Sequence, residues 1–238
     1  MCFHVKSPTG LELGELCARH GLGTRQEGQL AALLEGLASD EHAPTSVRGC
    51  EDALALHIAD SLSALELAVL GRRARIVDVG SGAGFPGLAL AVALPRSELT
   101  LLESQARRCR FIEAQITRAG VANARVVCAR AEEWREGLRA QDVALARAVG
   151  PTALVLEYAA PLLRRGGALI DWRGRREPAE EEVAERVGPV LGLERAEIRR
   201  VEPFPGAREH NLHLYVKVQD TPERFPRRAG IARKRPIQ

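Results

Sequence analysis

Two patterns of apolar residues alternate along the chain from about residue 73 onward. Short apolar runs bounded by glycine or polar residues predict buried strands, whereas apolar positions at helical spacing predict helices. Helices are expected over 88–94, 105–120, 151–163 and 178–191, and parallel strands over 76–79, 99–102, 125–128, 143–146 and 168–172. Two further alternating strands, 196–201 and 212–218, predict a closing hairpin. The expected fold is α/β, with a seven-stranded, mostly parallel sheet and helices on both faces.

The first 72 residues show helical spacing and no strand pattern. Three helices are expected there, over 11–20, 29–38 and 51–70. Thr24 and Glu27 have the spacing of a capping box. The sequence therefore predicts an N-terminal helical cap over 1–72, a sheet domain over 73–220 and an extended basic tail over 221–238.

Composition is typical of a soluble globular protein, since 45% of the 238 residues are hydrophobic and 27% are charged. No apolar run approaches the ~20 residues of a membrane span, and no apolar segment of a secretory signal follows Met1–Lys6. The five cysteines are scattered and form no C-x-x-C pair. We therefore expect a protein of the reduced cytoplasm, with no metal and no membrane partner.

A glycine loop follows the first expected strand directly, with glycines at 80, 82, 84 and 87. About twenty residues later the next strand ends in Glu103. Glycines let the backbone approach a ligand, and an acid at the following strand end binds ribose hydroxyls. The spacing predicts a nucleotide-type cofactor site formed by Gly80, Gly82, Gly84 and Glu103. The alternatives are a turn that only joins strand to helix and a solvated acid.

The spacing of the loop also distinguishes between cofactors. A dinucleotide fingerprint, G-x-G-x-x-G, places its third glycine at position 85, which is Phe85 here. A side chain there obstructs the close pyrophosphate approach that NAD needs, whereas S-adenosylmethionine has no pyrophosphate. Residues 78–84 also look like the first motif of S-adenosylmethionine-dependent methyltransferases. This resemblance implies that Ala131 and Glu132, after the third strand, contact the adenine edge, unless the acid only begins a helix.

The end of the fourth strand, residues 146–151, contains neither a nucleophile nor an acid. Such a site suits an acceptor atom with an available lone pair, such as guanine N7, because no proton must leave before attack. Catalysis is then largely the alignment of acceptor and methyl group. Arg147 is a candidate for holding cofactor or substrate, the alternative being a surface arginine. Cys109 and Cys128 are expected to be small core residues, so no catalytic acid, base or nucleophile is assigned.

His57 and Asp60 share one face of the expected helix 51–70, among leucines. Either this polar stripe meets solvent, or it faces the cofactor cleft. In the second case both residues are candidates for positioning the substrate together with Arg147.

The expected tail carries six basic residues against one acid, although the formal net charge of the whole chain is only +3. Clustered cations can neutralise phosphates. The RNA-binding candidates in the tail are Arg227, Arg228, Arg233, Lys234 and Arg235. The alternative is that the tail packs on the protein's own surface and its charges are solvated.

Together these motifs resemble one family, the RsmG (GidB) methyltransferases of bacteria. They are T-S-V-R at 45–48, H-I-A-D-S at 57–61, D-V-G-S-G-A-G-F-P-G at 78–87, L-L-E-S at 101–104, A-R-A at 146–148 and the basic tail at 225–236. This chain departs from the family in two ways. It lacks a W-N-x-x-x-N-L segment at 37–44, and it has Glu103 where aspartate is common.

The resemblance implies a Rossmann-like class I methyltransferase that uses S-adenosylmethionine. The implied substrate is N7 of a guanine in small-subunit (16S) ribosomal RNA, either naked or in a ribosomal particle, and we expect a monomer. Implied cofactor contacts come from Gly80, Phe85, Ala131, Glu132 and Arg147, and Arg48 is a further RNA-binding candidate. The alternatives are a methyltransferase of small molecules, which would not need the basic tail, and a non-catalytic RNA-binding assembly factor.

We predict that the purified protein binds S-adenosylmethionine and not NAD, because Phe85 replaces the third fingerprint glycine. Gly82→Val should abolish binding, because a branched side chain blocks the close approach of backbone to ligand. Isothermal titration calorimetry with both ligands measures the difference, and tighter binding of NAD would contradict the assignment.

Overall fold

The computed structural model describes residues 10–47, 49–71 and 73–237. A single seven-stranded sheet, with strand order β3-β2-β1-β4-β5-β7-β6, runs through the molecule. The strands are β1 (Arg75–Val79), β2 (Glu98–Glu103), β3 (Ala124–Cys128), β4 (Gln141–Arg147), β5 (Leu163–Arg173), β6 (Leu193–Val201) and β7 (His210–Lys217). Strands β1 to β5 pair in parallel, and β7 is antiparallel to both of its neighbours. The expected fold class and number of strands are confirmed.

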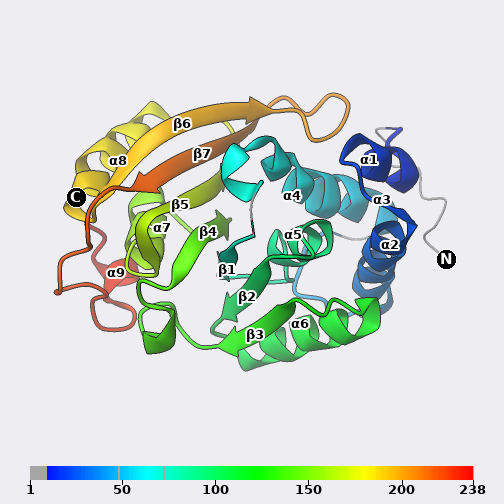
Figure 1. Ribbon diagram of the computed structural model, residues 1–238, viewed down its shortest axis with the longest axis horizontal. Helices are drawn as coiled ribbons and strands as arrows, with labels where there is room; N and C mark the ends of the chain where they lie inside the picture. The colour runs from blue at the N-terminus through cyan, green and yellow to red at the C-terminus, as the bar shows by residue number, and fades with distance from the viewer. Residues whose placement is uncertain (1–9, 48, 72, 238) are drawn as a thin grey trace.

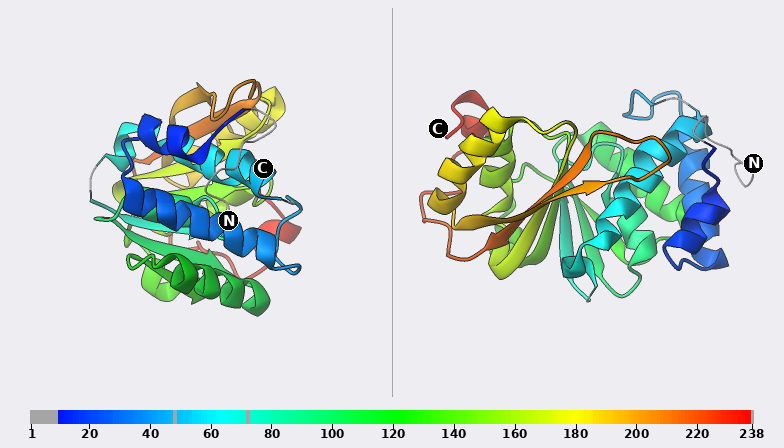
Figure 2. Two further views of the ribbon diagram at one scale, coloured as in Figure 1. Left: turned by 90° about the vertical axis from the view of Figure 1, so that its right-hand side faces the viewer. Right: turned by 90° about the horizontal axis from the view of Figure 1, so that it is seen from above.

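Helices cover both faces of this sheet (Figure 1 and Figure 2). They are α1 (Leu13–Arg19), α2 (Thr24–Ser39), α3 (Cys50–Ala53), α4 (Asp60–Leu62), α5 (Gly87–Ala93), α6 (Ala106–Ala119), α7 (Thr152–Ala159), α8 (Pro178–Val190) and α9 (Ile231–Lys234). Helices α1 to α4 form the cap at one end of the molecule, and α7 to α9 lie toward the other end (Figure 1).

Two hydrophobic clusters hold the helices on the sheet. On one face the cap, α5 and α6 pack on strand residues such as Ile76 and Leu101. On the other face α7 and α8 pack on the strand residues that alternate with these, including Val77 of β1 and Leu102 of β2. The strands are therefore buried on both sides, which explains their continuous apolar runs. Because the leucines of the cap belong to the same cluster as one face of the sheet, their burial depends on that face.

The single helix expected over 51–70 is wrong, because this part of the cap is a series of short segments. Helix α3 passes into a π-helical segment, Leu54–Ala59, which is followed by α4 and by 3-10 turns at Ser63–Glu66 and Ala68–Leu70. A π-helical turn is wider than an α-helical one and is frequently found at functional sites. It changes which side chains share a face, so α-helical spacing could not place His57 relative to Asp60.

The boundary between α7 and β5 also differs from expectation. Helix α7 ends at Ala159 and β5 begins at Leu163, so Gly166 and Gly167 lie within a strand instead of ending a helix. A β-carbon on Gly167 would lie 2.9 Å from the backbone oxygen of Asp142. Glycine at 167 therefore allows close pairing with β4 rather than stopping a helix.

The start of α2 is capped by different residues from those expected. Gly23 occupies the N-cap position, and its N–H donates to Oε1 of Gln26 at 3.0 Å. Thr24 is already the first residue of the helix. The expected capping box of Thr24 with Glu27 is therefore wrong by one position.

The cysteines only partly follow the sequence-based expectation. Cys109 is buried in α6, as expected, whereas Cys128 is exposed at the end of β3. Cys50 is disulfide-bonded, so the expectation of reduced thiols is wrong for this residue.

The C-terminal segment packs against the protein, so the expectation of an extended tail is wrong. Phe225 belongs to the cluster formed by α7 and α8, and Ala232 of α9 is fully buried. Helix α9 lies beside α7 (Figure 1). We call residues 221–237 the C-terminal strap.

Two expectations fall outside the described residues, namely the RNA contact of Arg48 and the lack of a secretory signal after Met1–Lys6. In the part of the chain that the structure describes, no helix combines the length and the apolar character needed to cross a membrane. The same residues include no group of three or more His, Cys, Asp or Glu side chains able to hold a metal ion.

Candidate active site

Two cavities lie at the carboxyl ends of the parallel strands, where open α/β sheets bind their ligands. The first, which we call the glycine-loop cavity, is lined by Gly80, Glu103, Ala131 and Glu132 together with residues of α7 and α9. The second, which we call the large cavity, has a volume of about 520 Å³ and lies beside the ends of β4, β5 and β7. Ala148 lines both cavities. The segment that follows β4 is therefore their common wall.

Two acids shape the glycine loop. Asp78, at the end of β1, accepts a hydrogen bond from the N–H of Gly87 at 2.9 Å and so ties α5 to the sheet. Burial raises the pKa of Asp78 to about 6. Glu103 accepts hydrogen bonds from the N–H of Gly82 at 3.0 Å and from the N–H of Ser104 at 2.7 Å. Backbone groups thus fix the Glu103 carboxylate at the edge of the cavity.

The three expected loop glycines have different roles. Gly80 lines the cavity in a left-handed conformation, with φ of +72°, and a β-carbon there would lie 3.3 Å from Val149. Gly82 binds Glu103 through its N–H. At Gly84 a β-carbon would lie 2.5 Å from the Leu88 side chain, so this glycine makes room for α5. Only Gly80 of the three lines the cavity.

Phe85 lies toward the cap and is not among the residues that line the glycine-loop cavity. Its buried ring stacks on the imidazole of His57, with ring centroids 5.0 Å apart. Phe85 therefore joins the glycine loop to the cap. Its contact with a cofactor stays a prediction from the family resemblance.

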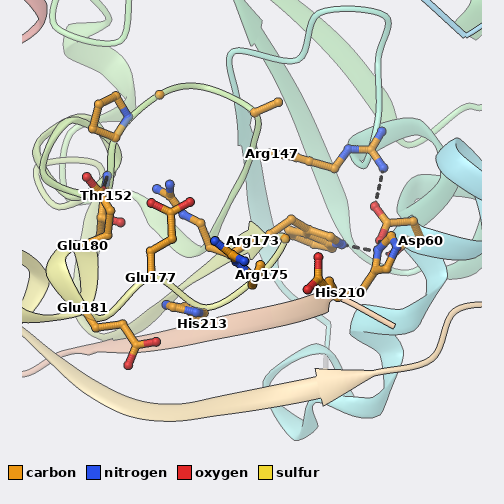
Figure 3. Close-up of a pocket in the computed structure, with 16 residues that line it drawn as sticks. Asp60, Arg147, Thr152, Arg173, Arg175, Glu177, Glu180, Glu181, His210 and His213 are labelled. Atoms are coloured by element: carbon orange, nitrogen blue, oxygen red, sulfur yellow. Dashed lines mark hydrogen bonds and ion pairs between the residues drawn. The ribbon is translucent and has the colours of Figure 1, made fainter. Parts of the chain in front are cut away.

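Arg147, the last residue of β4, binds three groups of the cap. Its guanidinium donates to Oδ2 of Asp60 at 2.8 Å, to the backbone oxygen of Leu56 at 3.0 Å and to Nδ1 of His57 at 3.2 Å. Because arginine only donates, Nδ1 of His57 is the acceptor and Nε2 carries the proton, which it donates to Thr45 at 2.9 Å. The structure thus brings His57, Asp60 and Arg147 together. Asp60 and Arg147 line the large cavity (Figure 3).

Asp60 links these cap residues to two further strands. Its Oδ1 accepts a hydrogen bond from Nδ1 of His210 at 2.9 Å, and its backbone oxygen accepts one from the indole of Trp172 at 3.0 Å. Burial alone would raise the pKa of Asp60. The hydrogen bond from His210 and the charge of Arg147 lower it by more than burial raises it, so the pKa lies below its ordinary value. Asp60 is therefore an ionised link between the cap, β4, β5 and β7.

No pattern in the sequence indicates His210 or Trp172 as site residues. Trp172 lies on β5, opposite Leu212 of the antiparallel strand β7. No spacing along the chain relates either residue to Asp60, which lies more than a hundred residues earlier. Only the register of the two strands brings them to the site.

The rest of the large cavity carries charges of both signs. Across it from Arg147 and Asp60 lie Glu177, Glu180 and Thr152 (Figure 3). Glu180 accepts a hydrogen bond from the N–H of Thr152 at 2.7 Å and so caps α7. These groups present both donors and acceptors to a ligand.

Beneath them, the imidazole of His213 is 4% exposed, and neither of its nitrogens has a hydrogen-bond partner among the described residues. Burial lowers the pKa of His213 to about 4, so the ring is neutral near pH 7. A neutral imidazole can donate with one nitrogen and accept with the other, which suits a polar heterocycle.

No cysteine is among the residues described as lining either cavity. Burial and the neighbouring Cys128 raise the pKa of the Cys109 thiol to about 12, which keeps it protonated and a weak nucleophile. Asp60, the acid that binds the end of β4, is already bonded to Arg147 and His210. The geometry therefore favours alignment of an acceptor over covalent or general-base catalysis.

The site predicts a measurable pH dependence of stability. Burial, with the charge of Arg147 beside it, lowers the pKa of His57 to about 4. The unfolded state therefore binds a proton before the folded state does, and stability falls as the pH drops from about 6.5 to about 4. His57→Gln should reduce this acid-induced fall in the free energy of unfolding by roughly 1–3 kcal/mol. Urea unfolding near neutral pH and near pH 4.5 measures it, and an equal fall in both proteins would contradict the prediction.

Comparison with known proteins agrees with this geometry. The family model for GidB, rRNA small subunit methyltransferase G, matches residues 27–205. Ribosomal RNA small subunit methyltransferase G of Syntrophomonas wolfei is 41% identical over 183 residues, which are 76% of this chain and 85% of that protein. The protein of the same description from Carboxydothermus hydrogenoformans is 36% identical over 199 residues, which are 81% of this chain and 83% of that one.

Solved structures show the same fold at low sequence identity. Aeropyrum pernix fibrillarin, in complex with S-adenosylmethionine, superposes with a TM-score of 0.53 at 19% identity, covering 66% of this chain and 73% of that chain. A SAM-dependent methyltransferase from Aquifex aeolicus gives a TM-score of 0.54 at 15% identity, covering 70% and 93%. These two likenesses show a Rossmann-like methyltransferase fold. With the family model and the relatives, they establish that the chain belongs to the GidB family, rRNA small subunit methyltransferase G.

Proposed function

We propose that this protein transfers a methyl group from S-adenosylmethionine to N7 of a guanine in small-subunit ribosomal RNA. The observation that carries the proposal is the pair of cavities that share Ala148 as a wall. One has the residues expected of a nucleoside cofactor site, and the other has polar groups suited to a base. Family membership favours ribosomal RNA as the source of that base. We further propose that the protein is cytoplasmic, where such a substrate is found, and acts as a monomer.

The residues of the glycine-loop cavity fit S-adenosylmethionine. Glu103 is held where it could accept hydrogen bonds from both ribose hydroxyls, and Ala131 and Glu132 lie where an adenine edge would be. At Gly80 the left-handed backbone leaves space that a β-carbon would reduce. When bound, the cofactor supplies a methyl group that its sulfonium makes electrophilic.

The large cavity suits guanine as the acceptor. Guanine presents N7 and O6 as acceptors and the N1–H and N2–H groups as donors. Arg147 and Arg173 carry donors at this cavity, Glu177 and Glu181 carry acceptors, and the neutral His213 can serve as either. N7 already has a lone pair, so the protein needs to align the base rather than deprotonate it.

Arg147, Asp60 and His57 serve as positioning residues in this proposal. The Arg147 side chain is only 15% exposed and that of Asp60 9%. Their ion pair therefore lies partly shielded from water, where its geometry is better defined than that of a surface pair. It fixes the end of β4, and with it the segment at Ala148 where the two cavities adjoin and where the acceptor nitrogen must meet the methyl group.

The prediction is that cells with this protein contain one N7-methylated guanine in small-subunit ribosomal RNA that cells without it lack. Mass spectrometry of nuclease-digested RNA from both strains measures it, and the large-subunit RNA of the same cells is the control. Returning the intact gene should restore the methyl group. Identical small-subunit spectra from the two strains would contradict the proposal and leave the small-molecule and non-catalytic alternatives.

A further inference from the structure

The C-terminal strap is anchored to α7 through a buried acid. Arg227 forms a two-pronged ion pair with Glu157, with Nε 2.6 Å from Oε1 and Nη2 2.5 Å from Oε2. Glu157 is only 1% exposed, and a buried carboxylate needs such a partner. Arg227 also donates to the backbone oxygen of Arg235 at 2.8 Å, which closes the strap into a loop. These bonds make Arg227 part of the fold, although the clustered charge of the tail predicts an RNA contact for it.

A second anchor joins the strap to the glycine-loop cavity itself. The N–H of Gly230 donates to Oε1 of Glu132 at 2.9 Å. Glu132 is 7% exposed and lines that cavity. Two residues after Gly230, Ala232 of α9 is fully buried. The turn that begins α9 is therefore fixed to one of the expected cofactor-binding residues.

These anchors bring Arg233 to the same cavity. Its side chain and that of Tyr158, from α7, are both among the lining residues, and the charge of Arg233 acts on the Tyr158 hydroxyl. Helix α9 lies beside α7 in Figure 1. The strap thus adds a cation to a cavity otherwise formed by the sheet domain.

We propose that the C-terminal strap forms one wall of the cofactor site, with Arg233 contacting the adenosine of S-adenosylmethionine. The identity of the cofactor rests on the function proposed above. An arginine fork supplies donors to the acceptor nitrogens of adenine and can stack on its face. Two other cations line this cavity. Arg108 lies 3.8 Å from Glu103, on the expected ribose side. Arg130 and Arg233 both act on the Tyr158 hydroxyl, near the expected adenine, and Arg233 is the one that the strap contributes.

This assignment divides the basic residues of the strap by role. Arg233 serves the cofactor, and Arg227 holds the strap in place. Four basic residues remain, and none of them lines the cavity. Arg224 lies over the ring of Phe225. The other three keep their candidacy as RNA contacts: Arg228, Lys234 and Arg235. A strap that served RNA alone would leave cofactor affinity unchanged when Arg233 is replaced.

The test is calorimetry of the full-length protein with S-adenosylhomocysteine, which carries the same adenosine. Arg233→Ala should weaken binding about tenfold, as expected for the loss of one charge-assisted contact. Lys234→Ala is the matched control, because it removes the same charge from the adjacent exposed position, and it should leave the affinity unchanged. A second probe, 5′-methylthioadenosine, lacks the amino-acid end and should show the same loss with Arg233→Ala.

Each alternative result has a definite meaning. Unchanged affinity in Arg233→Ala would overturn the proposal. Equal losses in Arg233→Ala and Lys234→Ala would also overturn it, because they would show a general effect of charge. A loss for S-adenosylhomocysteine without one for methylthioadenosine would place the contact at the methionine end and overturn the adenosine assignment. Failure of the unmodified protein to bind either probe would instead contradict the proposed function.

Discussion

The arrangement of the active site depends on the hydrogen bonds of one guanidinium group. Arg147 ends β4 and binds the backbone of Leu56 and the side chains of His57 and Asp60, all from the cap. The next residue, Ala148, is the wall common to both cavities and has a φ of +56°. A non-glycine residue in the left-handed region costs on the order of 1–3 kcal/mol, so its surroundings must hold it there. Arg147 ties that wall to the cap.

The same bonds explain why the site has little acid–base chemistry. Asp60 is ionised and bonded to Arg147 and His210, and burial beside Arg147 keeps His57 neutral. Arg147, Asp60 and His57 therefore hold one another in place and are not free to move protons. An acceptor that already has a lone pair, such as guanine N7, needs nothing more than alignment from such a site.

How much of this structure the sequence predicts depends on how far apart along the chain the interacting residues lie. The glycine loop, Glu103 and all seven strands followed from spacing along the chain, because a parallel sheet with short connections brings neighbouring strand ends together. The π-helical segment was missed because apolar spacing does not distinguish it from an α-helix. His210 and Trp172 were missed because the register of β7 against β5 brings them to Asp60. The docked strap depends on a bond between Arg227 and Glu157, seventy positions apart.

The central claim is that Asp60, by holding Arg147 at the end of β4, aligns the acceptor with the methyl group and does not itself contribute to cofactor binding. The most direct measurement is the single-turnover rate of methyl transfer to small-subunit ribosomal RNA by Asp60→Asn, taken together with its affinity for S-adenosylhomocysteine. Asparagine keeps the shape and removes the charge. The account predicts a rate lower by about tenfold or more, as for misplaced reactants, with the affinity unchanged. An unchanged rate, or a loss of affinity as large as the loss of rate, would contradict it.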